Sequence, residues 1–169
     1  MKEKLIFREL KETDWEQVSS IYQEGLDTGN ATFETNLPDW DSWNSGHIKE
    51  CRLIAEIDNE IVGWAALSPI SSRCVYGGVA EVSVYVSSKF SGQKIGTKLL
   101  EQLIVESENN GIWTLQAGIF PENKGSIIIH KRLGFRKVGY REKIGKMNGI
   151  WRNTFLFEKR SQSLGVKNQ

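Results

Sequence analysis

The spacing of apolar side chains along the chain predicts seven strands separated by turns and helices. In the clearest strand, 81–86, three valines alternate with polar and aromatic residues, so the two sets point to opposite faces of a sheet. Strands are predicted at residues 5–7, 52–57, 61–67, 81–86, 113–119, 136–143 and 150–157. A short connection at 58–60 predicts one hairpin, and Asn148-Gly149, a dipeptide that favours a type I′ turn, predicts another.

Helical spacing of apolar residues is strongest in 95–108, which predicts an amphipathic helix. Helices are predicted at residues 15–26, 39–43, 95–108 and 124–133. Thr13 and Glu16 form a capping-box pattern before the first of them, and Asn123 and Gly134 are suited to begin and end the last. Because helices alternate with strands, we expect a single α/β domain whose sheet is partly parallel.

Composition and charge remove several classes of function. The 169 residues suit one domain, which we expect at 1–159, followed by a polar tail at 160–169 that looks frayed. The net charge is +1, from 22 basic and 21 acidic residues, whereas a nucleic-acid surface needs a clear basic excess. No apolar run approaches the roughly 20 residues that cross a bilayer. We therefore expect neither nucleic acid nor membrane as a partner.

Cysteine and histidine are scarce. Cys51 and Cys74 are the only cysteines and His47 and His130 the only histidines, so the chain has neither a disulfide framework nor a cluster with metal-ligand spacing. The first ten residues lack a signal-peptide core. The sequence therefore predicts a cytoplasmic protein without a metal.

A glycine-containing turn at 91–96 joins the strand at 81–86 to the helix at 95–108. The first N–H groups of a helix have no partner within the helix, and the helix dipole adds positive charge at the same end. Glycine lets the backbone approach a phosphate closely. The segment is therefore suited to bind a pyrophosphate, although a plain turn into an ordinary helix explains it equally well. It has neither the GK[ST] of a Walker loop nor a GxGxxG pattern.

A second motif, 123–135, reads NKGSIIIHKRLGF and narrows the choice. An Asn that opens a helix ending in Leu-Gly-Phe resembles the second cofactor motif of the GNAT superfamily of N-acetyltransferases. Within it, 30–34, 80–87 and 149–153 resemble the phosphinothricin and methionine sulfoximine acetyltransferase group. The resemblance extends from about Leu5 to Lys159.

This resemblance implies a mixed, twisted sheet of about seven strands flanked by about four helices. It also implies acetyl-CoA as co-substrate, with backbone groups of 84–86 beside the pantetheine arm. The implied cofactor-binding residues are Val84, Tyr85, Val86, Ser91, Gly92, Gln93, Lys94, Ile95, Gly96, Thr97, Asn123 and Ser126. Ordinary strand, turn and helix-cap roles would account for the same residues.

The turn departs from the superfamily pattern at two positions. Ser91 stands where Gln or Arg is usual, and Lys94 replaces the first glycine, while Gly96 is retained. A lysine forced to a positive φ would cost about 1–2 kcal/mol. We expect Lys94 in the first helical turn instead, where it is unstrained.

Glu81 is the candidate base. It begins the strand at 81–86, on the face opposite the valines, and an attacking amine must lose a proton that a carboxylate can accept. The resemblance implies this role for the matching glutamate. The alternative is a solvated carboxylate or an ion pair with Arg73.

The remaining candidates also come from the resemblance. The implied substrate-binding residues are Phe33, Ser72, Arg73, Cys74, Tyr76 and Glu81. Arg73 could bind a substrate carboxylate, or be a surface arginine; Phe33 could wall the substrate site, or pack in the core. His130 stands where many members carry a tyrosine that protonates the leaving thiolate, although a lone histidine on a helix is more often packed or solvated.

The sequence thus predicts an N-acetyltransferase that moves the acetyl group of acetyl-CoA to the primary amine of a small, amino-acid-like molecule. Phosphinothricin, methionine sulfoximine and methionine sulfone are the model substrates. A polyamine, an aminoglycoside or a protein N-terminus are alternative acceptors, and a non-catalytic acetyl-CoA sensor is the alternative of another class. The resemblance further implies a homodimer.

Overall fold

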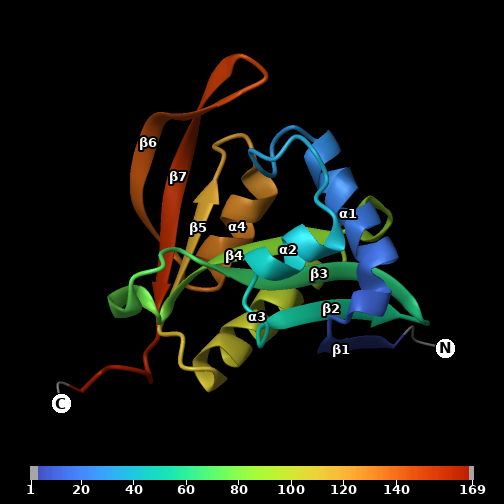
Figure 1. The fold of residues 1–169 in the computed structure, drawn as a ribbon, viewed down its shortest axis with the longest axis horizontal. Coiled ribbons are helices and arrows are strands. Elements are labelled where there is room, and N and C mark those ends of the chain that lie inside the picture. The colour runs from blue at the N-terminus through green and yellow to red at the C-terminus, as the bar shows by residue number, and fades with distance from the viewer. Residues whose placement is uncertain (1–3, 168–169) are drawn as a thin grey trace.

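A computed structural model describes residues 4–167 as a seven-stranded sheet with helices on both faces (Figure 1). The strand order is β1-β2-β3-β4-β5-β7-β6. The strands are β1 (Leu5–Glu9), β2 (Arg52–Ile57), β3 (Glu60–Pro69), β4 (Val79–Val86), β5 (Thr114–Ile119), β6 (Arg136–Met147) and β7 (Ile150–Arg160). The helices are α1 (Trp15–Asp27), α2 (Trp40–Gly46), α3 (Ile95–Asn109) and α4 (Lys124–Arg132), with single 3-10 turns η1 (Glu12–Asp14), η2 (Cys74–Tyr76) and η3 (Ser88–Phe90).

Both predicted hairpins are present, and the predicted mixed α/β fold is confirmed. Asp58 and Asn59 turn the first hairpin, and Asn148 and Gly149 turn the second with φ angles of 49° and 80°, both positive as a type I′ turn requires. Among the described strands, β4 and β5 alone pair in parallel. The predicted element ends differ most in β6, which continues to Met147 because β7 pairs with it to the turn.

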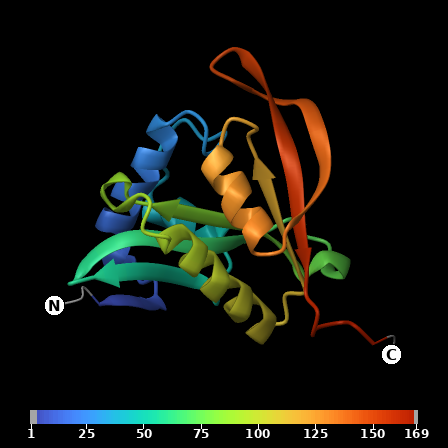
Figure 2. The same ribbon diagram turned by 180° about the vertical axis from the view of Figure 1, so that it is seen from behind.

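The two faces of the sheet bury different side chains. α1 and α2 cover one face and α3 and α4 the other, as the two opposite views show (Figures 1 and 2). The α3 side is mostly aliphatic, with Leu99, Leu100 and Leu103 fully buried, while the α1 side holds an aromatic cluster around Trp43 and Trp64. Within residues 4–167, no helix combines the length and apolar content needed to cross a membrane.

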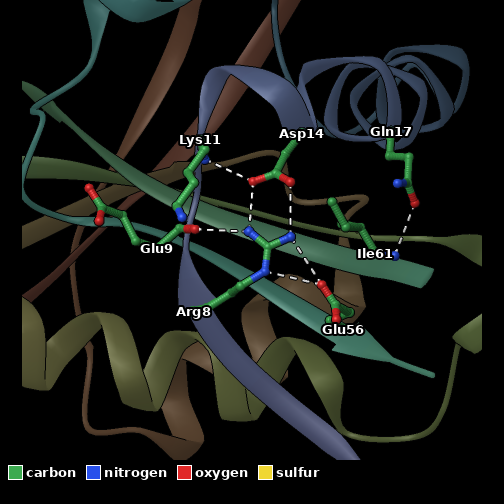
Figure 3. Close-up of polar contacts among 7 residues, drawn as sticks. All are labelled: Arg8, Glu9, Lys11, Asp14, Gln17, Glu56 and Ile61. Carbon is green, nitrogen blue, oxygen red and sulfur yellow. Dashed lines mark hydrogen bonds and ion pairs between the residues drawn. The ribbon is translucent and has the colours of Figure 1, made fainter. Parts of the chain in front are cut away.

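A polar network fastens the amino-terminal strand to its neighbours (Figure 3). The Arg8 guanidinium donates to both oxygens of Asp14, at 2.8 and 2.9 Å, and its Nε donates to Glu56 Oε2 at 3.1 Å. These bonds hold the pKa of the Asp14 carboxyl below its ordinary value, because they stabilise the charged form. The network therefore ties β1, η1 and β2 together.

The predicted capping box of Thr13 and Glu16 is wrong. The chain enters α1 through η1, and Asp14 is the N-cap residue of the helix. The Asp14 carboxylate accepts the N–H of Lys11 at 2.8 Å as well as the arginine bonds, so it closes the preceding turn instead of capping the helix. The role of Asp14 is therefore set by its ion pair with Arg8 of β1, a contact that the capping-box pattern does not contain.

The segment after 159 is packed where the structure describes it. β7 includes Arg160, and Ser161 donates its N–H to the Trp113 carbonyl at 2.7 Å and its hydroxyl to Glu108 at 2.6 Å. The Arg160 guanidinium donates to the Leu164 carbonyl at 2.8 Å. The start of the expected tail is therefore fixed to α3 and β5.

β4 and β5 part after three paired positions. Their register ends at Glu81 and Gln116, so the rest of β4 faces β5 without pairing to it. On its other edge β4 stays paired to β3 as far as Val86. The sheet is therefore split at its centre, and the split positions the candidate site.

Candidate active site at the split in the sheet

A cavity of about 760 Å³ lies where β4 and β5 part. Its walls come from both strands, the starts of α3 and α4, the β6–β7 hairpin and the loop at 31–34. Its volume falls within the roughly 300–1,000 Å³ of small-molecule sites. The predicted site residues that line it are Phe33, Glu81, Val84, Tyr85, Val86, Gly96, Asn123, Ser126 and His130.

The free edge of β4 offers backbone groups to this cavity. Ser87 donates its N–H to the Val62 carbonyl at 2.8 Å, so it points toward β3. Because successive residues of a strand point their backbone groups to opposite sides, Val82, Val84 and Val86 direct their N–H and C=O groups into the split. A bound molecule could pair with them as a strand would.

The side chains of β4 separate by face. The three valines pack toward the α3 side, and Tyr85 packs on the α1 side with its ring 4.9 Å from Tyr22 and 4.8 Å from Trp64. Burial raises the pKa of the Tyr85 hydroxyl above its ordinary value, because the phenolate would lose its solvation. The Tyr85 hydroxyl is therefore neutral, and Tyr85 forms an uncharged part of the cavity wall.

The turn before α3 places a helix N-terminus beside the split. Gly92 has a φ of 80°, and Glu24 of α1 accepts the Ser88 N–H at 2.7 Å, which anchors the turn. Gly96 lines the cavity, and a Cβ there would lie 3.3 Å from Ile129 Cδ1, so any larger residue would crowd α4. Ser91, Gly92, Gln93 and Lys94 of the turn, and Ile95 and Thr97 at the start of α3, lie outside the cavity lining.

The expectation for Lys94 is wrong. Lys94 is the N-cap residue of α3 with a φ of 62° and a ψ of 18°, in the left-handed region, and not in the first helical turn. The β4–α3 connection must reverse direction here to aim the helix at the split, which requires the conformation that glycine adopts without cost. A lysine there costs about 1–2 kcal/mol.

α4 begins beside the cavity and contributes His130. Asn123 accepts the Ser126 N–H at 3.2 Å, as expected of an N-cap. The buried His130 ring has Nδ1 2.7 Å from the Ser126 carbonyl, so Nδ1 carries the proton and Nε2 keeps a lone pair. Within residues 4–167, Nε2 has no partner, and burial holds the His130 pKa below its ordinary value. This form of His130 can accept a hydrogen bond at Nε2; it could protonate a thiolate from there only after taking up a proton.

Glu81 lies where the two strands separate. Its Oε2 accepts a hydrogen bond from Gln116 Nε2 at 3.2 Å, and the residue is exposed on the α1 side of the sheet. The alternative ion pair with Arg73 is absent, because Arg73 instead stacks over the Tyr76 ring at 5.5 Å. Glu81 is thus free to meet a ligand that enters from this side.

Four predicted substrate residues lie elsewhere. Ser72, Arg73, Cys74 and Tyr76 are exposed around η2 and do not line the cavity. The structure therefore does not bring them together with Glu81 within one chain, and their role stays a prediction.

The wall opposite Glu81 is aromatic. Phe33 meets Phe120 edge to face at 4.8 Å, and a Cβ on Gly145 would lie 2.8 Å from the Phe33 ring. Gly145 belongs to the β6–β7 hairpin, so the loop carrying Phe33 packs directly on that hairpin. Phe33 is 38% exposed, which fits a wall of the site better than a core position.

Arg152 of β7 fastens this wall. Its guanidinium donates to the Gly29 carbonyl at 2.9 Å and to Asn30 Oδ1 at 2.8 Å, lies 4.0 Å from the centre of the Phe120 ring, and pairs with Glu122 at 3.4 Å. One side chain thereby joins the hairpin, the loop at 29–33 and the segment after β5.

Sequence reasoning missed the residues that the hairpin and loop bring in. Glu34, Phe120, Arg141, Ile144 and Gly145 line the cavity. With Glu81, Glu34 and Arg141 are the charged residues of the lining. The hairpin itself was predictable from Asn148-Gly149, but the register shift between Arg141 and Gly145 was not. Among residues 4–167, no group of three or more His, Cys, Asp or Glu side chains is arranged to hold a metal ion.

Comparison with known proteins gives a family match. The model of the acetyltransferase (GNAT) family matches residues 11–135, well over half of the chain. The matched region contains β4, α3, β5 and α4, which together form the split and its two helix N-termini.

Relatives and solved structures agree with this match. The chain is 28% identical over 158 residues to a phosphinothricin N-acetyltransferase of Alcaligenes faecalis, which covers 90% of this chain and 80% of that protein. A ribosomal-protein-alanine N-acetyltransferase from Brucella melitensis has a similar structure, with a TM-score of 0.84, 28% identity, and 92% and 99% of the two chains covered. A GNAT superfamily phosphinothricin acetyltransferase from Sinorhizobium meliloti, solved with acetyl-CoA, has the same fold, with a TM-score of 0.85, 24% identity, and 97% and 92% covered.

Proposed function

Because this chain belongs to the acetyltransferase (GNAT) family, we propose that it transfers the acetyl group of acetyl-CoA to the primary amine of a small, amino-acid-like molecule. The family makes the chain an acetyl-CoA-dependent N-acetyltransferase. The amino-acid-like substrate is our proposal, and the phosphinothricin acetyltransferases among its relatives support it.

The split in the sheet supports a site for acetyl-CoA. The backbone groups of Val82, Val84 and Val86 would pair with the amides of the pantetheine arm. The N–H groups at the start of α3 would bind the pyrophosphate, where the helix dipole favours negative charge. Gly96 leaves room for both, since a larger residue would meet α4. A β4 amide could also stabilise the oxygen of the thioester as it becomes negatively charged.

Glu81 would act as the base. The amine nitrogen attacks the thioester carbon, the carbon–sulfur bond breaks, and the amine proton passes to the carboxylate directly or through water. An amine whose pKa is about 2–3 units above the ambient pH needs about 3–4 kcal/mol for this deprotonation. His130, neutral and hydrogen-bonded through Nδ1, would form part of the cavity wall beside the start of α4, with its Nε2 buried.

The observation that carries the proposal is the single carboxylate at the point where β4 and β5 part. Glu81→Gln should lower kcat/KM about 100-fold or more, with the largest loss at low pH, where the substrate amine is most fully protonated. Initial rates of thiol release from pH 6 to 9 measure this. Glu101→Gln on the outer surface of α3 is the control. A pH–rate profile of Glu81→Gln that matches the unsubstituted protein would remove Glu81 from the base role.

The acceptor is identified with a panel of amines. Phosphinothricin, methionine sulfoximine and methionine sulfone represent the proposed class, while spermidine, an aminoglycoside and an alanine-first peptide represent the alternatives. The alanine-first peptide is included because one structural relative is a ribosomal-protein-alanine N-acetyltransferase. An acetyl-CoA sensor would bind the cofactor and release no thiol with any amine.

We also expect two copies of the chain to associate. β6 is an edge strand of the sheet, and the hairpin it forms exposes large apolar side chains. They are Val138, Tyr140, Ile144, Ile150 and Trp151, between 45% and 66% exposed. A second copy could cover them, as the family resemblance implies. The cytoplasmic location likewise stays a prediction.

A further inference from the structure

We propose that Arg141 binds an anionic group of the substrate, at the end of the molecule remote from the amine that Glu81 deprotonates. This inference rests on the proposed function and names the feature that would set its substrate preference. It moves the recognition of negative charge from Arg73, which lies outside the cavity, to a residue of the β6–β7 hairpin.

The pairing of the strands places Arg141 on the same face as Glu81. Arg141 pairs with Thr154 of β7, and Gln116 pairs with both Glu81 of β4 and Glu158 of β7. Thr154 and Glu158 are four residues apart, so they point to the same face of the sheet. The side chains of Arg141 and Glu81 therefore point to one side, toward the loop that carries Phe33.

The same register separates the two groups along the sheet. Four residues correspond to about 13 Å along a strand, so Arg141 lies well beyond Glu81 on the far side of the split. A molecule with an amine at one end and an acidic group at the other could reach both. A simple alkylamine has no acidic group, so it could interact with Glu81 but not with Arg141.

The charges of the cavity lead to the same assignment. Of the lining residues in the described part of the chain, Arg141 alone is cationic, beside the carboxylates of Glu34 and Glu81. Within residues 4–167, Arg141 forms no salt bridge and no side-chain hydrogen bond, so its guanidinium is free for a ligand. A guanidinium binds a carboxylate or phosphinate through two parallel hydrogen bonds.

Two nearly isosteric amino acids isolate this effect. Phosphinothricin ends in an anionic methylphosphinate, and methionine sulfone ends in an uncharged methylsulfone of almost the same shape. The ratio of their kcat/KM values therefore reports the recognition of one negative charge. Replacing Arg141 by alanine should lower this ratio about 10- to 100-fold, as expected for the loss of hydrogen bonds to a charged group, chiefly through KM for phosphinothricin.

Arg141→Lys should give a ratio of kcat/KM values between those of Arg141→Ala and the unsubstituted protein. Lysine keeps the positive charge but lacks the planar guanidinium that forms two parallel hydrogen bonds. Lys146→Ala removes one positive charge from the same strand outside the cavity lining and should leave the ratio unchanged. Calorimetry with CoA should give the same Kd for Arg141→Ala and the unsubstituted protein, because Arg141 is on the face of the sheet opposite α3.

Four results would overturn the assignment. An unchanged ratio in Arg141→Ala would show that the arginine does not recognise the anion. A weakened Kd for CoA would assign the guanidinium to the cofactor. Acetylation of the alternative amines alone, with no calorimetric binding of phosphinothricin in the presence of CoA, would remove the proposed substrate class and this inference together. Turnover of both amino acids that is independent of Arg141 would remove this inference alone.

Discussion

At the scale of single residues, Lys94 adopts a strained backbone conformation beside the site. Its positive φ lets the chain turn sharply from η3 into α3, so the first amides of the helix face the split. Gly92, two residues earlier, adopts its positive φ without a steric cost. The strain at Lys94 is therefore stored in the turn that we assign to the pyrophosphate.

Replacing Lys94 by glycine should relieve this strain. We expect the free energy of unfolding to rise by about 1 kcal/mol, because the left-handed conformation no longer clashes with a Cβ, partly offset by the greater freedom of the unfolded chain. Urea denaturation measures the change. Lys98→Gly, in the interior of α3, is the matched control and should destabilise the protein by about 1 kcal/mol. Equal destabilisation by both substitutions would contradict a strained Lys94.

At the scale of elements, the β6–β7 hairpin completes the side of the cavity that we assign to the substrate. The hairpin carries Arg141 and Gly145 into the cavity wall, and Arg152 ties it to the loop at 29–33. β6 is bulged between Arg141 and Gly145, and a bulge bends its strand, here where the hairpin faces the cavity. The site therefore depends on contacts between elements that are more than 120 residues apart in sequence.

Arg152 should act as a positioning residue. In Arg152→Ala the loop loses two hydrogen bonds to a charged group, so we expect KM for the amine to rise about tenfold, while kcat and the Kd for CoA change little. Arg152→Lys should raise KM for the amine less than Arg152→Ala does, since lysine keeps a charged hydrogen-bond donor. Arg132→Ala, at the exposed end of α4, is the control. If the loop were held by Phe33 alone, amine KM in Arg152→Ala would stay at its original value.

At the scale of the whole molecule, the split sheet leaves one side of β4 unpaired. In a continuous seven-stranded sheet, the backbone groups of every interior strand would normally be hydrogen-bonded on both sides. Here β4 and β5 share only three paired positions. A ligand that binds along this edge adds the missing partner to the native state alone. The stability of the fold and the affinity for acetyl-CoA are therefore linked.

CoA should stabilise the whole domain accordingly. At a free concentration of about 100 times its Kd, it should raise the free energy of unfolding by about 2.7 kcal/mol. For a chain of this size, that corresponds to an increase of about 5–10 °C in Tm. Scanning calorimetry at several CoA concentrations, with adenosine alone as the control, tests this. A Tm that does not depend on CoA would mean that the split is not its binding site.

Much of the site was predictable because its motifs are local. The strand 81–86, the turn at 91–96 and the Asn123 cap each follow from residues close in sequence. The strand and the cap line the cavity, and the turn reaches it through Gly96. The capping box at Thr13 and the unstrained Lys94 were wrong because contacts outside each motif decided the geometry. Arg8 of the preceding strand β1 binds the Asp14 carboxylate, and the direction of α3 fixes the φ of Lys94. Neither constraint is part of the sequence pattern on which the prediction was based.

The sequence by itself determined the elements, their amphipathic faces and the two motifs that we assign to the cofactor, because hydrophobic periodicity and turn chemistry act over a few residues. Only the tertiary structure decided that β4 and β5 part after Glu81, and that Arg141, Phe33 and Phe120 surround the space so formed. Strand register and loop docking depend on contacts between distant segments, whose free energies compete only once the chain has folded.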